Sequence, residues 1–294
     1  MSKPKPVFSD VTVIGAGWSG LMACKYMLEV GLTVVALEKR SDIGGLWCFS
    51  NDPNIVTVMT STKTTSSSSV TEMSDFPMPD EIGAFPKHTD ILAYLKSYCD
   101  EFNLWPHIRL DHGVKEARKK DNLWRVECDN GRAFMSKFLI VCTGCVQKPN
   151  RVLECTLLQD FEGLMYHSSK LKSFVPGHEG NRVMVIGGGE TASDVVEEWC
   201  DHADRVIWSI PRGMHFFRKF AKILPNRQPQ ALDKASSRAM KFIAPYTKGK
   251  PGIVILLTFI KTCFEFEFVC AKESSEQAGP HVLIGAACIM YRFW

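Results

Sequence analysis

The chain has 294 residues, of which 45% are hydrophobic and 23% charged, and these proportions are typical of soluble globular proteins. They argue against a disordered or fibrous protein, and the length is sufficient for two domains. The formal charge of +3 is spread along the chain, because the one basic run, Arg118–Lys120, is flanked by acidic residues. We therefore predict an α/β protein that does not bind nucleic acid.

The cysteines and the N-terminus indicate the compartment. Eleven irregularly spaced cysteines and an N-terminus without an apolar signal stretch favour reduced thiols and a cytoplasmic protein. No segment reaches the roughly 20 apolar residues of a membrane-spanning helix. The most apolar runs, Ile253–Ile260 and Val282–Tyr291, leave peripheral association with an internal membrane open, although a buried strand or helix is the simpler interpretation. The sequence does not indicate an oligomeric state.

A strand, a helix and a second strand are predicted near the N-terminus, over Val11–Gly15, Leu21–Val30 and Thr33–Leu37. The turn before the helix has the pattern GxGxxG, and Glu38 ends the second strand. In such a unit the glycines allow a tight turn, close approach of a pyrophosphate and close helix packing. The carboxylate accepts hydrogen bonds from the ribose hydroxyls. The predicted dinucleotide site comprises Glu38 and the turn residues Gly15, Ala16, Gly17, Trp18, Ser19 and Gly20.

A Ser- and Thr-rich stretch, Thr57–Ser69, follows and predicts a long ordered loop or a solvated linker. It leads into Ser74–Pro79 (SDFPMP), whose prolines exclude a helix or a central strand.

Regular structure resumes with a helix that has its apolar face at Ile91–Phe102 and that Thr89 or Asp90 could cap. Strands are then predicted over Leu123–Cys128 and Ala133–Cys142. The second of these is nearly continuous in apolar residues, so we expect it to be buried.

A second strand, helix and strand are predicted over Val183–Gly187, Thr191–Cys200 and Arg205–Ile210, which implies a second parallel sheet. The intervening turn repeats the glycine pattern, with Ala192 at its third position. No acidic residue ends the last strand, and Arg212 follows it, which favours the 2′-phosphate of NADPH over the free hydroxyl of NADH. The alternative is that Arg212 is a solvated loop residue.

Four further motifs lie in a fixed order: EKRSDIGGLW (38–47), SDFPMP (74–79), VCTG (141–144) and FEGLMYHS (161–168). With the two glycine turns they resemble the flavin-containing monooxygenase family, over Val11–Gly213. In the family motif FxGxxxHxxx(Y/F), Phe161, Gly163 and His167 match, and Leu171 replaces the final aromatic residue.

The resemblance implies FAD contacts at the first glycine turn, Glu38, Leu46 and Trp47, with Thr143 and Gly144 closing over FAD. It implies NADPH contacts at Gly187, Gly189, Thr191, Ala192, Ser193 and Asp194. A family asparagine beside the flavin ring corresponds to Thr65, with Ser66 next to it. These two are our catalytic candidates, although a hydroxyl cannot copy the paired donor and acceptor of an amide.

The implied reaction is that NADPH reduces FAD, dioxygen forms a peroxyflavin, and a small molecule with a soft nucleophilic nitrogen or sulfur atom takes one oxygen. A Baeyer–Villiger oxygenase shares both glycine turns and is the alternative within enzymes. Cys142 and Cys145 form a CxxC motif typical of disulfide reductases, but packing and turn formation at a strand end explain them without redox chemistry. His167 is either a structural residue on a linker or a catalytic one.

We expect an FAD domain over 1–175, an NADPH domain over 176–252 and an atypical tail over 253–294. In the family the chain returns to the FAD domain with a further strand and a second TG turn, and only Thr143-Gly144 is found. The sequence therefore predicts an incomplete FAD domain, with apolar surface uncovered on its sheet. A C-terminally truncated flavoprotein with weak or absent turnover is the alternative to an active oxygenase.

Overall fold

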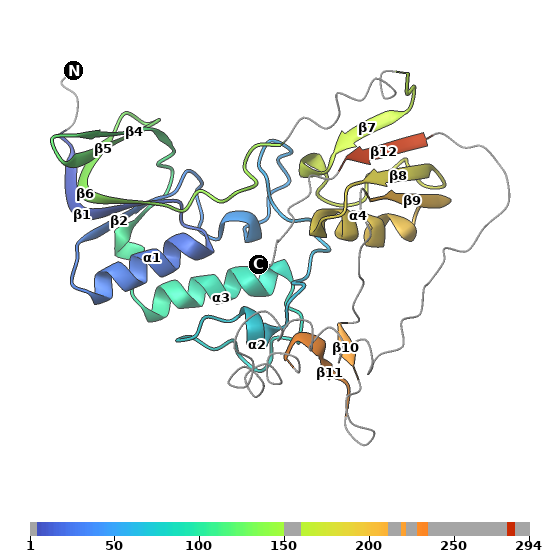
Figure 1. The fold of residues 1–294 in the computed structure, drawn as a ribbon, viewed down its shortest axis with the longest axis horizontal. Helices are drawn as coiled ribbons and strands as arrows, with labels where there is room; N and C mark the ends of the chain where they lie inside the picture. The colour runs from blue at the N-terminus through green and yellow to red at the C-terminus, as the bar shows by residue number, and fades with distance from the viewer. Residues whose placement is uncertain (1–4, 150–159, 211–218, 222–227, 235–280, 286–294) are drawn as a thin grey trace, which may run out of the picture.

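The computed structural model describes residues 5–149, 160–210, 219–221, 228–234 and 281–285. They form two units, each built on its own sheet, which lie at the left and right of Figure 1. The chain is therefore an α/β protein, as predicted. None of the described helices is long and apolar enough to cross a membrane.

The first sheet has six strands in the order β3-β2-β1-β6-β5-β4. Their bounds are β1 Val7–Ile14, β2 Val34–Leu37, β3 Ile108–Arg109, β4 Val114–Lys120, β5 Leu123–Cys128 and β6 Ala133–Val141. The prediction of a parallel sheet is wrong for β4 and β5, which pair antiparallel. Asp121 and Asn122 have φ values of 51° and 62°, the left-handed pair that closes a two-residue hairpin.

Two helices, α1 (Trp18–Glu29) and α3 (His88–Glu101), run side by side against one face of this sheet (Figure 1). Their apolar faces supply the first core, as the helical spacing predicted. The core side chains are fully or almost fully buried, among them Val11, Val13, Leu21, Ile91, Leu95 and Leu104.

The predicted cap of α3 is wrong. The helix starts at His88 with Lys87 as N-cap, and Asp90 occupies the third helical position, where it accepts the Lys87 N–H at 2.9 Å. A contact outside the helix also holds its first residue, because His88 N donates to Thr62 O at 3.2 Å. Local sequence preferences could not reveal this contact.

The expected burial of β6 holds only for its first half. Phe138 and Val141 are 57% and 63% exposed. The partner strand β5 pairs with β6 only as far as Ser136, so among the described strands the rest of β6 pairs with β1 alone. Apolar surface therefore does remain uncovered on this sheet, as we expected, and the exposed Phe8 on β1 adds to it.

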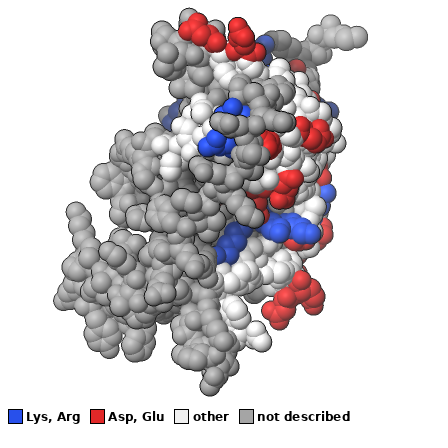
Figure 2. Space-filling model, turned by 90° about the vertical axis from the view of Figure 1, so that its right-hand side faces the viewer, with Lys and Arg blue, Asp and Glu red and all other residues white. Residues whose placement is uncertain are grey.

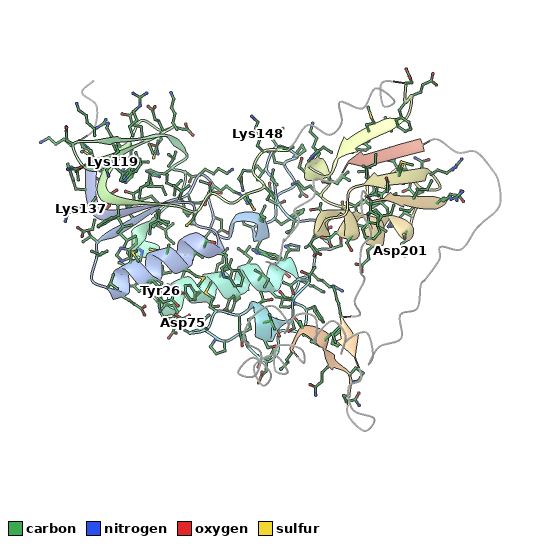
Figure 3. All side chains as sticks on the ribbon, in the orientation of Figure 1. Tyr26, Asp75, Lys119, Lys137, Lys148 and Asp201 are labelled. Atoms are coloured by element: carbon green, nitrogen blue, oxygen red, sulfur yellow. The ribbon has the colours of Figure 1, made fainter. Side chains whose placement is uncertain are left out.

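The SDFPMP motif is fixed against the helices of the first unit. Lys25 Nζ lies 2.6 Å from Asp75 Oδ2, and Tyr26 OH donates to the same oxygen at 3.3 Å (Figure 3). Tyr94 OH donates to Phe76 O and accepts from Met73 N at 2.8 Å. The stretch before it, predicted as an ordered loop or a solvated linker, is an ordered loop that contains the short helix α2 (Ser68–Thr71).

The second sheet has four parallel strands in the order β7-β12-β8-β9. Their bounds are β7 Leu164–His167, β8 Arg182–Ile186, β9 Arg205–Ser209 and β12 His281–Gly285, and α4 (Glu190–Cys200) packs on β8 and β9. The strand β12 comes from the expected tail and lies between β7 and β8 (Figure 1). The tail segments Ile253–Ile260 and Phe264–Cys270 lie outside the described residues.

The remaining elements are short. The pair β10 (Phe220–Ala221) and β11 (Gln230–Ala231) is antiparallel, and single 3-10 turns are η1 Gly45–Trp47, η2 Trp105–His107 and η4 Ser168–Lys170. On the described surface that faces the viewer in Figure 2, acidic and basic side chains are interspersed.

Candidate cofactor-binding site

Two glycines of the first turn are required by the packing of the chain itself. Gly15 has a φ of 100°, and a Cβ there would lie 2.5 Å from the Cys142 carbonyl oxygen. A Cβ on Gly20 would overlap the carbonyl oxygen of Gly15. Both glycines therefore let β1, α1 and the end of β6 meet closely.

Gly17 differs, because its own surroundings do not require a glycine. A Cβ there would meet nothing closer than the Gly45 Cα at 3.6 Å, an ordinary van der Waals distance. Gly17 is the N-cap of α1, no side chain caps this end, and the first turn has no acidic residue. The turn thus presents an uncompensated helix N-terminus with room for close approach, which fits the pyrophosphate of a dinucleotide.

Glu38 is buried beside this turn. One carboxylate oxygen accepts from Ala16 N at 2.8 Å and the other from Arg40 N at 3.0 Å. Each oxygen keeps a second acceptor position, so the carboxylate can also accept hydrogen bonds from ribose hydroxyls. The geometry fits the role that the sequence predicts for this residue in FAD binding.

The GGLW motif and the end of β6 border the same turn. Gly44 N donates to Ala16 O at 2.9 Å, which places Leu46 and Trp47, on η1, next to the turn. Cys142 N donates to Ile14 O at 2.8 Å, and the exposed Thr143 and Gly144 follow directly. The structure thus brings together the predicted FAD-contacting residues from four separate parts of the sequence.

The catalytic candidates lie on the loop before α2. Thr65 is exposed, and the half-buried Ser66 has its Oγ 2.7 Å from Thr71 Oγ1. The neighbouring Thr64 is 4% exposed, and its hydroxyl has no hydrogen-bond partner among the described residues. Sequence reasoning missed Thr64, because nothing in the Ser- and Thr-rich run distinguishes one hydroxyl from the next.

The second glycine turn lies between β8 and α4. Gly187 has a φ of 132° and donates to Ser209 O at 2.9 Å, and Gly189 is the N-cap of α4. Thr191 is exposed, Ser193 is half-buried and Ala192 is packed in the second core. Arg212, the candidate for the 2′-phosphate, lies outside the described residues.

One residue of this turn opposes an anionic ligand. Glu190 is exposed in the first turn of α4, where its carboxylate already interacts favourably with the helix N-terminus. A phosphate at the same place would be repelled by it. Glu190 was not among the residues predicted from the sequence, although it directly follows the three glycines.

Asp194 does not extend from α4 toward open solvent. Its Oδ2 accepts from Thr62 Oγ1 at 2.7 Å, across 132 positions of sequence. Burial raises the pKa of the Asp194 carboxyl to about 6, while the Thr62 hydrogen bond acts in the opposite direction. The carboxylate therefore joins the second glycine turn to the loop that carries Thr65 and Ser66.

The thiols do not have the surroundings of a redox centre. Cys142 and Cys145 are free, and burial raises the pKa of the Cys142 thiol, which opposes formation of the reactive thiolate. Burial also raises the pKa of Cys48. The structure therefore favours the packing interpretation of the CxxC motif.

His167 caps η4, where its Nδ1 accepts from Ser169 N at 3.2 Å. Burial lowers the pKa of His167, and the nearby Lys170 lowers it further. Both effects favour the neutral ring, and the capping position at the end of β7 favours the structural role.

Comparison with known proteins agrees with this geometry. A model of the family described as flavin-binding monooxygenase-like matches residues 9–230. Dimethylaniline monooxygenase (N-oxide-forming) 2 of Rattus norvegicus is 30% identical over 250 residues, which are 76% of this chain and 46% of that protein. The chain spans about half the length of the curated relatives it matches.

Solved structures show the same fold. A flavin-containing monooxygenase from Stenotrophomonas maltophilia superposes with a TM-score of 0.67 at 22% identity, over 97% of this chain and 79% of that one. An oxidized steroid monooxygenase bound to NADP gives 0.52 at 26% identity, over 69% and 38% of the two chains. With two glycine turns on two sheets and a family model that matches most of its length, this chain belongs to the flavin-binding monooxygenase-like family.

Proposed function

We propose that this chain binds FAD at the first glycine turn and NADPH at the second, and that it oxygenates a soft nitrogen or sulfur atom of a small molecule with dioxygen. The observation that carries the proposal is Gly17, whose missing side chain is explained by a close ligand and by no contact of the chain itself. Bound FAD would supply the redox chemistry, taking electrons from NADPH and passing them to dioxygen.

The residues of the chain bind and orient the cofactors. The N–H groups at the start of α1 donate hydrogen bonds to the pyrophosphate, and the buried Glu38 carboxylate accepts hydrogen bonds from the ribose hydroxyls. Thr65 and Ser66 offer hydroxyl donors beside the flavin ring, and Arg212 offers a cation to the 2′-phosphate of NADPH. Thr143 and Gly144 close the site from the end of β6.

The relatives support this assignment. The rat relative is named for N-oxide formation, and the steroid monooxygenase was solved with NADP bound. This chain covers only 46% of the rat protein and 38% of the steroid monooxygenase. The proposal for this chain therefore rests on the geometry of its own two glycine turns.

Reconstitution tests the proposal in steps. The purified chain is mixed with FAD, reduced anaerobically with NADPH while the flavin absorbance is followed, and then exposed to oxygen with a dialkyl sulfide or a ketone. We expect retained FAD, NADPH-dependent bleaching and a sulfoxide. An ester from the ketone would indicate Baeyer–Villiger chemistry, and hydrogen peroxide as the sole product of oxygen would indicate a flavoprotein that oxidises NADPH without oxygenating a substrate. A chain that does not bind FAD would contradict the proposal at its first step.

A further inference from the structure

A segment from the first half of the chain, Ile55–Thr62, is built into the second unit. Met59 is 2% exposed and packs in the second core, together with Leu171, directly after η4, and residues of β8 and α4. The same core includes Val183, Val195 and Trp199. The segment is therefore an internal part of the second unit, although it lies more than a hundred positions before α4 in sequence.

Lys172 fixes the start of this segment. Its ammonium group is buried and donates to Ile55 O at 2.6 Å and to Thr57 Oγ1 at 3.1 Å. Its backbone carbonyl accepts from Thr60 N at 2.8 Å. A buried lysine with two oxygen partners holds the segment firmly, because removal of either side would leave a buried polar group unpaired.

The end of the segment is attached to α4 by two carboxylates one helical turn apart. Thr62 Oγ1 donates to Asp194 Oδ2 at 2.7 Å, and Ser61 Oγ donates to Glu198 Oε2 at 2.5 Å. The other oxygen of Glu198 accepts from Phe174 N at 2.6 Å. Hydrogen bonds to ionised groups are the stronger kind. We therefore expect Ser61 and Thr62 to move together with α4 when this helix shifts.

Thr62 also contacts the first unit. Its carbonyl oxygen accepts from His88 N at the start of α3, and Thr64 N donates to Pro86 O at 2.8 Å. Thr65 and Ser66 follow within four positions. Thr62 thus lies between α4, whose N-terminus forms the second glycine turn, and the loop that carries both catalytic candidates.

We propose that the Thr62–Asp194 hydrogen bond couples NADPH binding to FAD binding, with both residues acting as positioning residues. A nucleotide at the start of α4 fixes this helix, and Asp194, one turn further on, passes that constraint to Thr62 and so to the loop at Thr65. This inference rests on the proposed function in that FAD and NADPH are the two ligands. Linkage requires that each ligand then tightens the binding of the other by the same factor.

Binding titrations measure the coupling without turnover. FAD is titrated by its fluorescence, with and without saturating NADP⁺, into the unmodified chain and its variants. We expect NADP⁺ to tighten FAD binding about tenfold, within the usual range of coupling between sites. Thr62→Val keeps the shape but removes the hydroxyl, which donates to Asp194 and also accepts from Met59 N at 3.1 Å, and it should reduce this factor to below about threefold. Thr62→Ser keeps the hydroxyl and should retain it.

Two further variants complete the test. Thr33→Val removes a hydrogen bond of the same kind, 2.7 Å from Thr33 Oγ1 to Asp10 Oδ2, within the first unit, and should leave the coupling intact. Asp194→Leu removes the acceptor and should lose the coupling, which provides a second variant should Thr62→Val fail to fold by circular dichroism.

The outcomes separate this inference from the proposed function. If FAD and NADP⁺ both bind and the coupling survives in folded Thr62→Val or Asp194→Leu, the inference is overturned while the proposed function stands. Equal loss in Thr33→Val would also overturn it, because the effect would then be general. A chain that binds neither ligand would overturn both.

Discussion

At the scale of single residues, the two classes of glycine in the first turn give different predictions. Gly17→Ala should leave the folded chain nearly unchanged, because the new methyl group meets only van der Waals neighbours. It should weaken FAD binding by about tenfold or more, the equivalent of ~1.4 kcal/mol, because the methyl group occupies the space that the pyrophosphate needs. FAD titration and thermal unfolding measure the two effects.

The matched control for this change is Gly83→Ala, since a Cβ there meets nothing within 4 Å and the residue is not part of the turn. It should alter neither FAD binding nor the unfolding temperature. If Gly17→Ala unfolded the chain, the glycine would be structural and the main observation behind the proposed function would be lost.

Glu190 gives the second prediction at this scale. Glu190→Gln should tighten NADP⁺ binding by about two- to fivefold at low salt, because it removes a negative charge from the helix end that receives the phosphate. The gain should shrink as ionic strength rises, since exposed charges are screened. Calorimetric titration at two salt concentrations checks both statements, and Glu197→Gln, exposed two turns into α4, should show no gain.

The sequence identified the residues whose roles depend on near neighbours. The glycines, Glu38 and the GGLW turn were predicted, because a strand, turn and helix follow each other directly and their spacing encodes the geometry. The partners of Asp194 were not, because Thr62 is 132 positions away and no local pattern marks the pair. Thr65 and Ser66 came from the resemblance to the family, and their roles stay predictions.

At the scale of elements, periodicity predicted α1, α3, α4 and six of the twelve described strands to within a few residues. Two failures have the same physical origin. The start of α3 depends on a contact with Thr62, and the exposure of Phe138 depends on where β5 stops pairing with β6. Each is decided by a neighbour in space that the strand or helix pattern does not contain.

Met59 lies within the range expected for the FAD domain, but it packs in the core of the second unit. This placement leads to a prediction. Met59→Ala should destabilise the protein by about 2–5 kcal/mol, as expected for a large side chain removed from a packed core. The loss should appear in the unfolding of the second unit, measured by the fluorescence of Trp199, which lies in the same core. Met165→Ala on β7 is the control, because that side chain is 55% exposed and its removal should cost little.

At the scale of the whole molecule, the two units share parts of the chain in a way that linear division does not describe. The segment Ile55–Thr62 crosses from the first unit into the second core, and β12 joins the second sheet from the expected tail region. Both arrangements depend on contacts between distant positions. The domain ranges 1–175, 176–252 and 253–294 therefore stay a proposal. Ile55–Thr62 and β12 each pack in the second unit although their positions lie outside the range 176–252.

The junction between the units makes a prediction about pH. Burial raises the folded-state pKa of Asp194 from 3.8 to about 6, so between those values the folded chain holds a proton that the unfolded chain has released. Stability contributed by this group therefore falls as pH rises from about 4 to about 6, and stays lower above that range. The full difference corresponds to about 2–3 kcal/mol, since one pKa unit is ~1.4 kcal/mol.

Asp194→Asn should remove this pH dependence, because the amide does not titrate and its oxygen still accepts from Thr62. Urea unfolding of the unmodified chain and the variant should give similar stabilities near pH 4.5 and a more stable variant near pH 7.5, by up to about 2 kcal/mol. The difference between the two curves isolates Asp194, because every other carboxyl group titrates in both proteins. Parallel curves over this range would show that the carboxylate is solvated in the folded chain, and that the contact between α4 and the Thr62 loop is open in solution.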